Sequence, residues 1–312
     1  MTRIAVIGAG MAGLACANAL RAAGHAPVVL EKSRGLGGRI ATRRTSEGPV
    51  FDHGAQFARA RNEPFAAFLD AAIEAGHAAR WEAAGDGRTV GLPGMSGLVR
   101  PLAEGLDVRF GVEVSAASRG DDGWTLTAGD GALGPFDRLV CAIPHPQALR
   151  LFGEDPTVRT ALAPVRVAPC WSLMVALPER LDRPAIGRDE AVPPDVAWIA
   201  HDGDKPGRDG ADTWVLHASP GYSRAHLEME REDAVERLME RFEVWAGRPV
   251  SPTLVRAHRW RFAMTMRSLE APCHVEADAG LILCGDWCLG ARIEDAYDSG
   301  RAAARALLEG TS

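Results

Sequence analysis

The chain is short of lysine and carries no excess of positive charge. Only Lys32 and Lys205 among its 35 basic residues are lysines, and the formal net charge is −6. An acidic chain has no general attraction for nucleic acid or for an anionic membrane, so we expect neither as a partner. Because arginine serves almost everywhere as the basic residue, a single arginine is most simply interpreted as a solvated surface charge.

Patterns for metal binding, disulfide bonding and membrane insertion are also missing. The six cysteines form no C-x-x-C pair, and the closest two, Cys284 and Cys288, have no histidine at ligand spacing. No apolar run reaches the length of a membrane span, and the first predicted strand starts at Arg3, which leaves no room for a signal peptide. We therefore expect no metal, reduced thiols and a cytoplasmic location, while the oligomeric state is left open.

What the sequence does contain is a βαβ unit at its start. Residues 3–7 form an apolar run typical of a buried strand, G-A-G-M-A-G leads into a helical pattern, and residues 25–31 form the next strand. In this turn Gly8 allows a tight bend, Gly10 lets a pyrophosphate approach the backbone, and Gly13 permits close packing of helix on strand. The free N–H groups at the start of the helix favour an anion.

A G-x-G-x-x-G motif alone is weak evidence, since a glycine turn can be purely structural. Here the motif follows a strand and opens a helix, and Glu31 ends the second strand, where its carboxylate can accept ribose hydroxyls. This combination predicts a dinucleotide ligand. Glu31 would repel a 2′-phosphate, which disfavours an NADP-type cofactor and leaves FAD or NAD.

The stretch E-K-S-R-G-L-G-G-R-I-A-T-R-R, residues 31–44, favours FAD over NAD. A simple NAD-dependent dehydrogenase needs only a turn and a helix after Glu31. Here Gly37 and Gly38 provide flexible backbone beyond it, and Arg39 provides a guanidinium group with several donors. The alternative is a surface loop with compositional arginines. We predict the longer cofactor.

The remainder of the chain predicts a second domain enclosed by the first. Short strand-like runs separated by Gly/Asp turns suggest a small sheet inserted in the nucleotide domain, at residues 106–110, 112–116, 124–128 and 139–143. Longer apolar strands and one amphipathic helix then predict an antiparallel sheet, at residues 170–177, 196–200, 213–218 and 223–245. Residues 281–308 indicate a strand, a Gly-Asp turn and a long helix that returns to the first sheet.

Several motifs resemble the flavin amine oxidase superfamily, namely V-I-G-A-G-M-A-G-L-A, E-K-S-R-G-L-G-G-R and a C-terminal C-G-D-W. Others, spread over nearly the whole chain, resemble more specifically the bacterial renalase-like proteins: G-G-R-I-A-T-R-R, F-D-H-G-A-Q-F, L-P-G-M-S-G-L, P-C-W-S-L-M, K-P-G-R, T-W-V-L-H-A-S-P, H-R-W-R-F-A and C-G-D-W-C-L-G. Several of these stretches lie outside the nucleotide fingerprint, so this resemblance is more specific than a generic flavoprotein match.

The resemblance implies an α/β fold with an α+β second domain. A Rossmann-like FAD-binding domain of the p-hydroxybenzoate hydroxylase type would consist of residues 1–50, 93–165 and 258–312. An inserted substrate domain, built on a mixed or antiparallel sheet, would consist of residues 51–92 and 166–257.

The resemblance also implies which residues bind FAD, when the family motifs are mapped by position. They are Gly8, Gly10, Ala12, Gly13, Glu31, Lys32, Gly38, Arg39, Val114, Gly285, Asp286, Arg292 and Ile293. We expect the flavin to be held without a covalent bond. Some relatives attach it through cysteine, and Cys288 is the candidate here, but apolar packing is the favoured role for this residue.

The implied reaction is the oxidation of 2- and 6-dihydro isomers of NAD(P) to NAD(P)+, with FAD taking the hydride and dioxygen reoxidising it to give hydrogen peroxide. A dihydropyridine regains aromaticity when it gives up hydride, so orientation suffices and no catalytic dyad is needed. Alternatives are an amine oxidase or desaturase acting on another small substrate, and a non-catalytic FAD-binding sensor or scaffold. The scarcity of tyrosine and lysine disfavours the aromatic cage and lysine of ordinary amine oxidases.

Candidate substrate-lining residues share aromatic or polar side chains that could stack on nicotinamide, pair with its carboxamide or contact a phosphate. They are His53, Gln56, Lys205, Arg208, Trp214, His217, His258 and Trp260. Each is also open to an ordinary structural interpretation. Asp52 is expected to orient its own loop, and the polar segment 201–212 to form a surface turn.

Overall fold

The parallel sheet predicted at the N-terminus forms around the first strand, β1 (Ile4–Ile7). The computed structural model describes residues 2–85, 87–187 and 192–310. All four residues of β1 are buried, as expected for a strand covered on both faces. β1 pairs in parallel with β2 (Val28–Glu31) on one side and with β11 (Arg138–Cys141) on the other. The carboxyl ends of these strands therefore share one edge, where α/β proteins bind ligands.

This sheet has six strands in the order β17-β18-β11-β1-β2-β7. The three further strands are β7 (Asp107–Phe110), β17 (His274–Glu276) and β18 (Leu281–Leu283). β17 runs antiparallel to β18, and the other neighbours pair in parallel. The last strand thus joins the sheet opened by the first, as predicted from residues 281–308.

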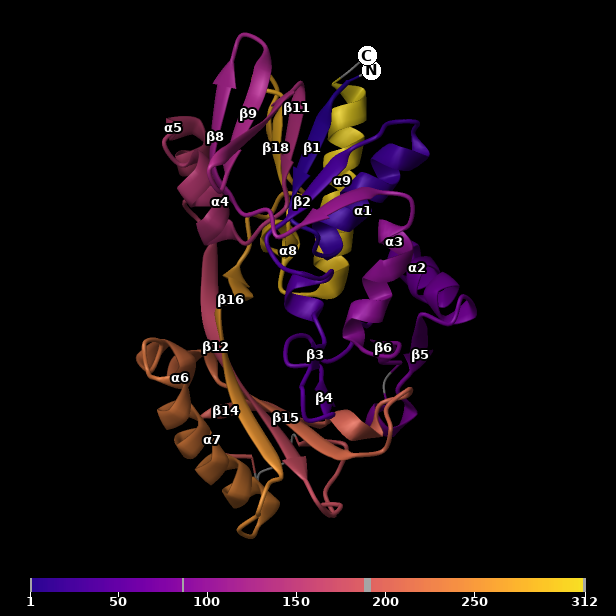
Figure 1. The fold of residues 1–312 in the computed structure, drawn as a ribbon, viewed down its shortest axis with the longest axis vertical. Coiled ribbons are helices and arrows are strands. Elements are labelled where there is room, and N and C mark those ends of the chain that lie inside the picture. Colours follow the sequence, from indigo (N-terminus) through magenta and orange to yellow (C-terminus); the bar gives the residue numbers. More distant parts are fainter. Residues whose placement is uncertain (1, 86, 188–191, 311–312) are drawn as a thin grey trace.

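Helices α1 (Met11–Ala22) and α9 (Ile293–Glu309) cover one face of this sheet (Figure 1). They approach closely, since a Cβ on Gly300 would collide with the carbonyl oxygen of Ala12. The other face packs against a three-stranded sheet and two helices: β8 (Val114–Gly120), β9 (Gly123–Ala128), β10 (Gly131–Phe136), α4 (His145–Phe152) and α5 (Pro156–Leu162). The strands near 106–110 and 139–143, predicted for the small sheet, instead join the parallel sheet as β7 and β11. β11 lies inside the sheet and is largely buried, whereas β7 is an edge strand with mostly exposed residues.

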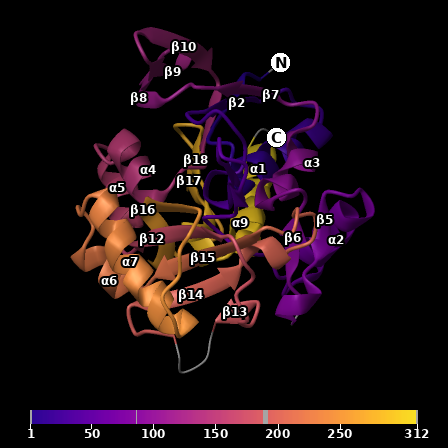
Figure 2. The ribbon, with the colours of Figure 1, turned by 60° about the horizontal axis from the view of Figure 1, so that its bottom comes forward.

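The second sheet is antiparallel throughout and has the order β13-β14-β15-β12-β16. Its strands are β12 (Arg166–Leu177), β13 (Ile186–Gly187), β14 (Val196–His201), β15 (Asp212–Ala218) and β16 (Leu254–Arg267). The predicted helix over 223–245 is two helices, α6 (Pro220–Ala225) and α7 (Arg231–Ala246), because the backbone is extended at Glu230. Both lie against one face of this sheet (Figure 2).

The long strands β12 and β16 connect the two parts of the molecule (Figure 1). The remaining elements are β3 (Arg43–Arg44), β4 (Val50–Phe51), α2 (Glu63–Glu74), β5 (Ala78–Arg80), β6 (Thr89–Gly91), α3 (Arg100–Ala103), α8 (Asp286–Leu289) and 3-10 turns at Gly38–Ile40, Glu82–Ala84, Met95–Val99 and Asp202–Asp204. Helix α2 contributes Phe65 and Leu69 to the core shared with α1 and α9. The proposed domain bounds remain a prediction.

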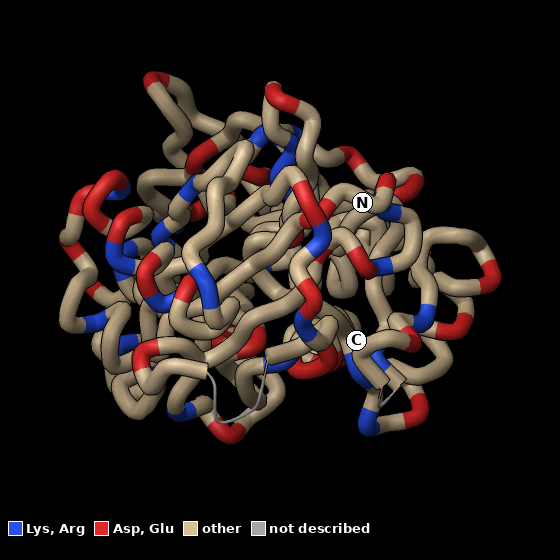
Figure 3. Tube along the Cα trace, turned by 90° about the horizontal axis from the view of Figure 1, so that it is seen from below, with Lys and Arg blue, Asp and Glu red and all other residues tan. Residues whose placement is uncertain are grey.

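Acidic and basic segments are interspersed along the chain (Figure 3). Several arginines pair with exposed carboxylates, as Arg261 does with Glu228 at 2.6 Å, in keeping with their interpretation as surface charges. Within the described ranges, none of the helices is both long enough and apolar enough to cross a bilayer.

Candidate cofactor and active site

The turn between β1 and α1 has the geometry of an anion site. Gly8 has φ +102°, and a Cβ on Gly13 would collide with the carbonyl oxygen of Gly8, so both positions require glycine. A Cβ on Gly10 would meet nothing closer than the carbonyl oxygen of Gly37 at 4.0 Å. The space above Gly10 is therefore open, and the free N–H groups of the first turn, including that of Ala12, lie beside it. These residues fit the pyrophosphate of a dinucleotide.

Glu31 is fixed at the end of β2 by its two carboxylate oxygens. One accepts from the N–H of Ala9 and the other from the N–H of Ser33, both at 2.8 Å. The side chain is buried and keeps lone pairs for ribose hydroxyls. Lys32 points outward with Nζ 4.0 Å from Glu113 Oε1, and Val114 starts β8 nearby in sequence.

The second glycine cluster carries Arg39 to the C-terminal Gly-Asp motif. Gly37 has φ +107° and its N–H donates to the carbonyl oxygen of Ala9, which brings the cluster against the first glycine turn. Arg39 then binds Asp286 through two nitrogens, one at 2.8 Å, although 247 residues separate the two. We expected Arg39 to face phosphate or flavin oxygens directly, but both terminal nitrogens bind protein oxygens, including Ala263 O at 3.2 Å.

The C-terminal motif forms the start of α8. The N–H of Gly285, at φ +154°, donates to Ser299 Oγ at 2.9 Å, and Asp286 begins the helix. Burial raises the pKa of the Cys288 thiol to about 12. A protonated, buried thiol is a poor nucleophile. This property fits a flavin that is bound without a covalent link better than one attached through a thioether. Arg292 is exposed and precedes α9, whose first residue, Ile293, is buried.

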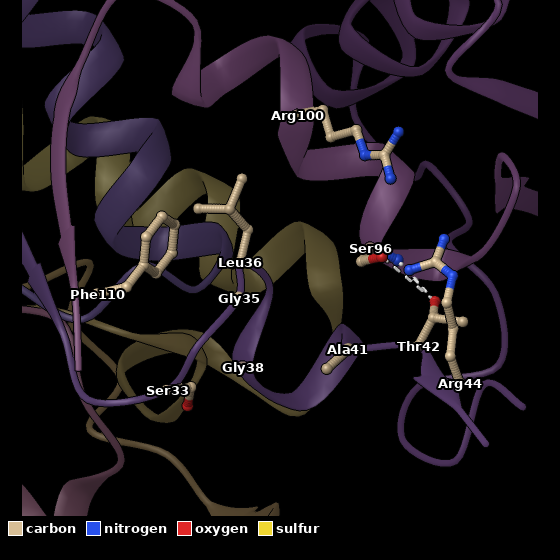
Figure 4. Close-up of a pocket in the computed structure, with 10 residues that line it drawn as sticks. All are labelled: Ser33, Gly35, Leu36, Gly38, Ala41, Thr42, Arg44, Ser96, Arg100 and Phe110. Atoms are coloured by element: carbon tan, nitrogen blue, oxygen red, sulfur yellow. Dashed lines mark hydrogen bonds between the residues drawn. The ribbon is translucent and has the colours of Figure 1, made fainter. Parts of the chain in front are cut away.

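A surface pocket of about 430 Å³ lies along the segment that follows Glu31 (Figure 4). Leu36 and Phe110 line one side, and Arg44 and Arg100 line the other. Two guanidinium groups beside the hydroxyls of Thr42 and Ser96 are suited to an anionic group. Sequence reasoning missed Phe110 and Arg100, which carry no motif and reach this pocket only because β7 and α3 pack beside the loop.

Four of the predicted substrate-lining residues come together from three segments, and we call them the His53 cluster: His53, His217, His258 and Trp260. The ring of His53 lies 4.8 Å from that of His258 and 4.9 Å from that of Trp260, between centroids. The carbonyl oxygen of His53 accepts from Trp260 Nε1 at 2.9 Å and contacts His217 Nε2 at 3.2 Å.

The His53 cluster adjoins Arg39. The N–H of Ala55 donates to the carbonyl oxygen of Arg39 at 2.9 Å. A Cβ on Gly54 would collide with that same oxygen and lie 3.4 Å from Trp260 Cζ2. The turn that carries His53 is therefore packed directly on the backbone of the residue that binds Asp286.

Ser172 belongs beside this cluster and was missed by sequence reasoning. It is the register partner of His217 on β15 and of His258 on β16, so the three side chains share one face of the sheet. Ser172 Oγ and His53 Nδ1 are buried and have no hydrogen-bond partner among the described residues. Buried polar atoms normally have hydrogen-bond partners, so these two atoms indicate a place where a polar ligand group or a water molecule can bind.

Burial keeps the three imidazoles uncharged. It lowers the pKa of His53 to about 3, and those of His217 and His258 to about 4. Neighbouring cations and imidazoles act in the same direction, as Arg43 does on His258. At neutral pH the cluster offers neutral hydrogen-bonding groups and aromatic faces, with no strong base.

We expect acid to destabilise the fold before its carboxylates titrate. The folded pKa of each imidazole is below its unfolded value near 6.5, so the unfolded state binds more protons as the pH falls through about 6.5. The stability supplied by these groups is complete above that pH and declines toward about 4. Urea midpoints measured between pH 7 and 5 should fall, with a smaller slope in His53→Gln. An equal slope in the variant would contradict this assignment.

The other four predicted substrate-lining residues have buried side chains that contact other protein groups, in place of the open surface that we expected. Lys205 and Arg208 were expected to bind a substrate phosphate, but both pair with Asp52 inside the protein. The amide of Gln56 is occupied by the carbonyl of Asp52 and the ammonium of Lys205, so it is not free for a carboxamide. The segment 201–212 is thus anchored by burial of charge and is not a simple surface turn.

Trp214 lies in the core under α7. Its ring is fully buried, 5.0 Å from that of Trp245 and 4.3 Å from that of His201, between centroids. Strand alternation explains the difference from His217: residues three apart on β15 point to opposite faces, and the face of Trp214 is the one covered by α7.

Comparison with known proteins agrees with this arrangement. The model of the family of flavin-containing amine oxidoreductases matches residues 58–308, and that of the NAD(P)-binding Rossmann-like domain matches residues 6–72. A 15-cis-phytoene desaturase from Synechococcus elongatus is 44% identical over 52 residues, which are 17% of this chain and 11% of the desaturase. That match thus spans only about a ninth of the desaturase.

Solved structures share the fold over the whole chain. A protein described as a protoporphyrinogen oxidase from Exiguobacterium sp. 255-15 has a TM-score of 0.77 at 15% identity, covering 99% of both chains. Cyclohexylamine oxidase from Brevibacterium oxydans has a TM-score of 0.71 at 15% identity, again over 99% of both chains. The Rossmann-like domain and the family match support FAD as the cofactor. With four fifths of its length matched, the chain belongs to the flavin-containing amine oxidoreductase family.

Proposed function

We propose that this protein is an FAD-dependent oxidase that takes hydride from 2- and 6-dihydro isomers of NAD(P) and releases NAD(P)+. FAD, when bound, supplies the hydride acceptor and then passes two electrons to dioxygen, which with protons gives hydrogen peroxide. The observation that carries the proposal is the uncharged His53 cluster, with its unpaired His53 Nδ1 and Ser172 Oγ, beside the Arg39–Asp286 pair.

This cluster suits a donor that needs orientation and no base. A dihydronicotinamide is uncharged at its ring, and it becomes aromatic when the hydride leaves. The faces of Trp260 and His258 are suited to stacking, and neutral imidazole or hydroxyl groups can bind a carboxamide. The substrate half that carries phosphates would lie outside the cluster, where the pocket with Arg44 and Arg100 offers cations.

An amine oxidase is the first alternative, since the structural neighbours include amine oxidases. The lysines and tyrosines that the usual amine oxidase chemistry would need do not belong to the His53 cluster. Lys205 is enclosed by acids, and Lys32 lies by Glu113. Tyr222 is buried in the core under α7, and Tyr297 stacks on Phe68 at 4.8 Å between ring centroids. These positions favour the dihydronicotinamide proposal over an aromatic cage with a lysine.

Anaerobic mixing tests the proposal against its rivals. We expect 2- or 6-dihydro-NAD(P) to bleach the flavin absorbance within the mixing experiment, and air to restore it with one hydrogen peroxide per cycle. The 4-dihydro isomer is the matched control, equal in mass and charge, and we expect it to react at least ~100-fold more slowly because its hydride lies elsewhere on the ring.

Bleaching by cyclohexylamine or putrescine alone would overturn the proposal in favour of an amine oxidase. Tightly bound FAD that no donor reduces and that forms no peroxide would instead support a sensor or scaffold.

A further inference from the structure

Four charged side chains that the proposed chemistry does not use meet in an enclosed group, which we call the ion cluster: Asp52, Asp202, Lys205 and Arg208. Lys205 Nζ lies 3.1 Å from Asp52 Oδ2 and 2.6 Å from Asp202 Oδ1, and these side chains have no exposed surface. Arg208 forms a further ion pair with Asp52. Two cations balance two carboxylates, as burial of charge requires.

Lys205 uses all three of its donors on this group and on the turn of residues 52–56. Its third contact is Gln56 Oε1 at 3.1 Å, so the ammonium binds side chains from both ends of the turn. Asp202, which Lys205 holds, accepts in turn from the backbone N–H of Asp52 at 3.1 Å. The start, the end and the backbone of the turn are therefore tied to a segment about 150 residues later.

The same turn contacts the site on its other side. The carbonyl oxygen of His53 holds Trp260 and His217, and the N–H of Ala55 donates to the carbonyl oxygen of Arg39. The space at Gly54 is filled by that same oxygen. A shift of the turn would therefore displace the His53 cluster and the backbone of Arg39 together.

We propose that Lys205 is a positioning residue. It holds the turn of residues 52–56 in the position that places the His53 cluster beside the Arg39–Asp286 pair. It acts through Asp52, Asp202 and Gln56 and does not touch the substrate. The proposal rests on the FAD site and on the His53 cluster described above, but it does not depend on which substrate donates the hydride.

Lys205→Met, compared with Asp212→Asn in the FAD-loaded protein, tests this role. Asp212 forms a buried pair with His201 at 2.8 Å in the same domain, and the partners described for it lie outside the turn. Both changes disturb a buried polar contact, so both should lower the melting temperature. We expect only Lys205→Met to alter the visible circular dichroism of the bound flavin and to slow its reduction at saturating donor by at least ~10-fold, because small displacements of reacting groups are costly.

A double variant covers the case in which Lys205→Met does not fold. Lys205→Met with Asp202→Asn keeps the ion cluster neutral through Asp52 and Arg208 while it removes the hold on Gln56. Flavin dichroism that matches wild type in this double variant, with an unchanged limiting reduction rate, would overturn the proposal. The dichroism needs no substrate, so a wild-type protein that no dihydronicotinamide reduces would overturn the proposed function alone.

Discussion

Gly10→Val is expected to give a folded protein that is purified without colour. The position is open in the structure, since a Cβ there meets nothing closer than Gly37 O at 4.0 Å, and its backbone is extended, which valine tolerates. The branched side chain would instead occupy the space that the pyrophosphate needs beside the start of α1. We expect FAD affinity to fall at least ~100-fold, about 2.7 kcal/mol, in titrations followed by flavin fluorescence.

Two further variants make this result specific. Gly13→Val should fail differently, by unfolding, because its Cβ would collide with Gly8 O inside the packed turn. Gly120→Ala, at an open position in β8, should keep both colour and stability. A yellow Gly10→Val protein with near-normal FAD affinity would rule out the assigned path of the pyrophosphate.

Arg39→Met is expected to cost about 3 kcal/mol of unfolding free energy in the apoprotein and to weaken FAD binding as well. Without Arg39, the buried carboxylate of Asp286 keeps its hydrogen bond with the hydroxyl of Thr265, 3.2 Å away, but has lost the charge that pairs with it. Removal of one partner of a buried pair is costly because the other charge stays desolvated. The lower end of the usual range applies since the Arg39 side chain is 29% exposed.

Arg261→Met is the matched control, because Arg261 also binds a carboxylate, that of Glu228, through two nitrogens. That pair lies at the surface, with both side chains well exposed, so its loss should cost less than ~1 kcal/mol. Urea unfolding of the three apoproteins, followed by tryptophan fluorescence, measures both values. Equal losses for the two variants would show that Arg39 is an ordinary surface arginine, as the composition of the chain suggests for most of its kind.

Local sequence patterns were sufficient to predict the βαβ unit and its dinucleotide-binding class. Gly8 is required by its own left-handed backbone, and Glu31 ends a short apolar run of buried-strand type that the sequence alone can locate. The parallel sheet, the antiparallel sheet and the returning C-terminal helix were likewise predictable, because each element carries its own hydrophobic period. These features were predictable because each is encoded by a short contiguous segment of the chain.

The positions of the predicted substrate-lining residues depended on pairings that no local pattern reveals. Lys205 and Arg208 sit in a polar, glycine-rich segment that predicts a surface turn, yet they are buried because Asp52, some 150 residues earlier, supplies the opposite charge. Arg39 pairs with Asp286, which lies 247 residues later in the sequence. Charge pairing of this kind is a property of the folded chain.

By itself, then, the sequence determined the βαβ unit, the Rossmann-like class of the parallel sheet and the antiparallel character of the second sheet. Only the tertiary structure decided which polar residues come together beside the Arg39–Asp286 pair. Alternation along β15 separates Trp214 from His217 in any case, but it does not say which face α7 will cover. That choice follows from packing: the helix buries the face of Trp214, and His217 is left with Ser172, His258 and the turn of His53 on the other.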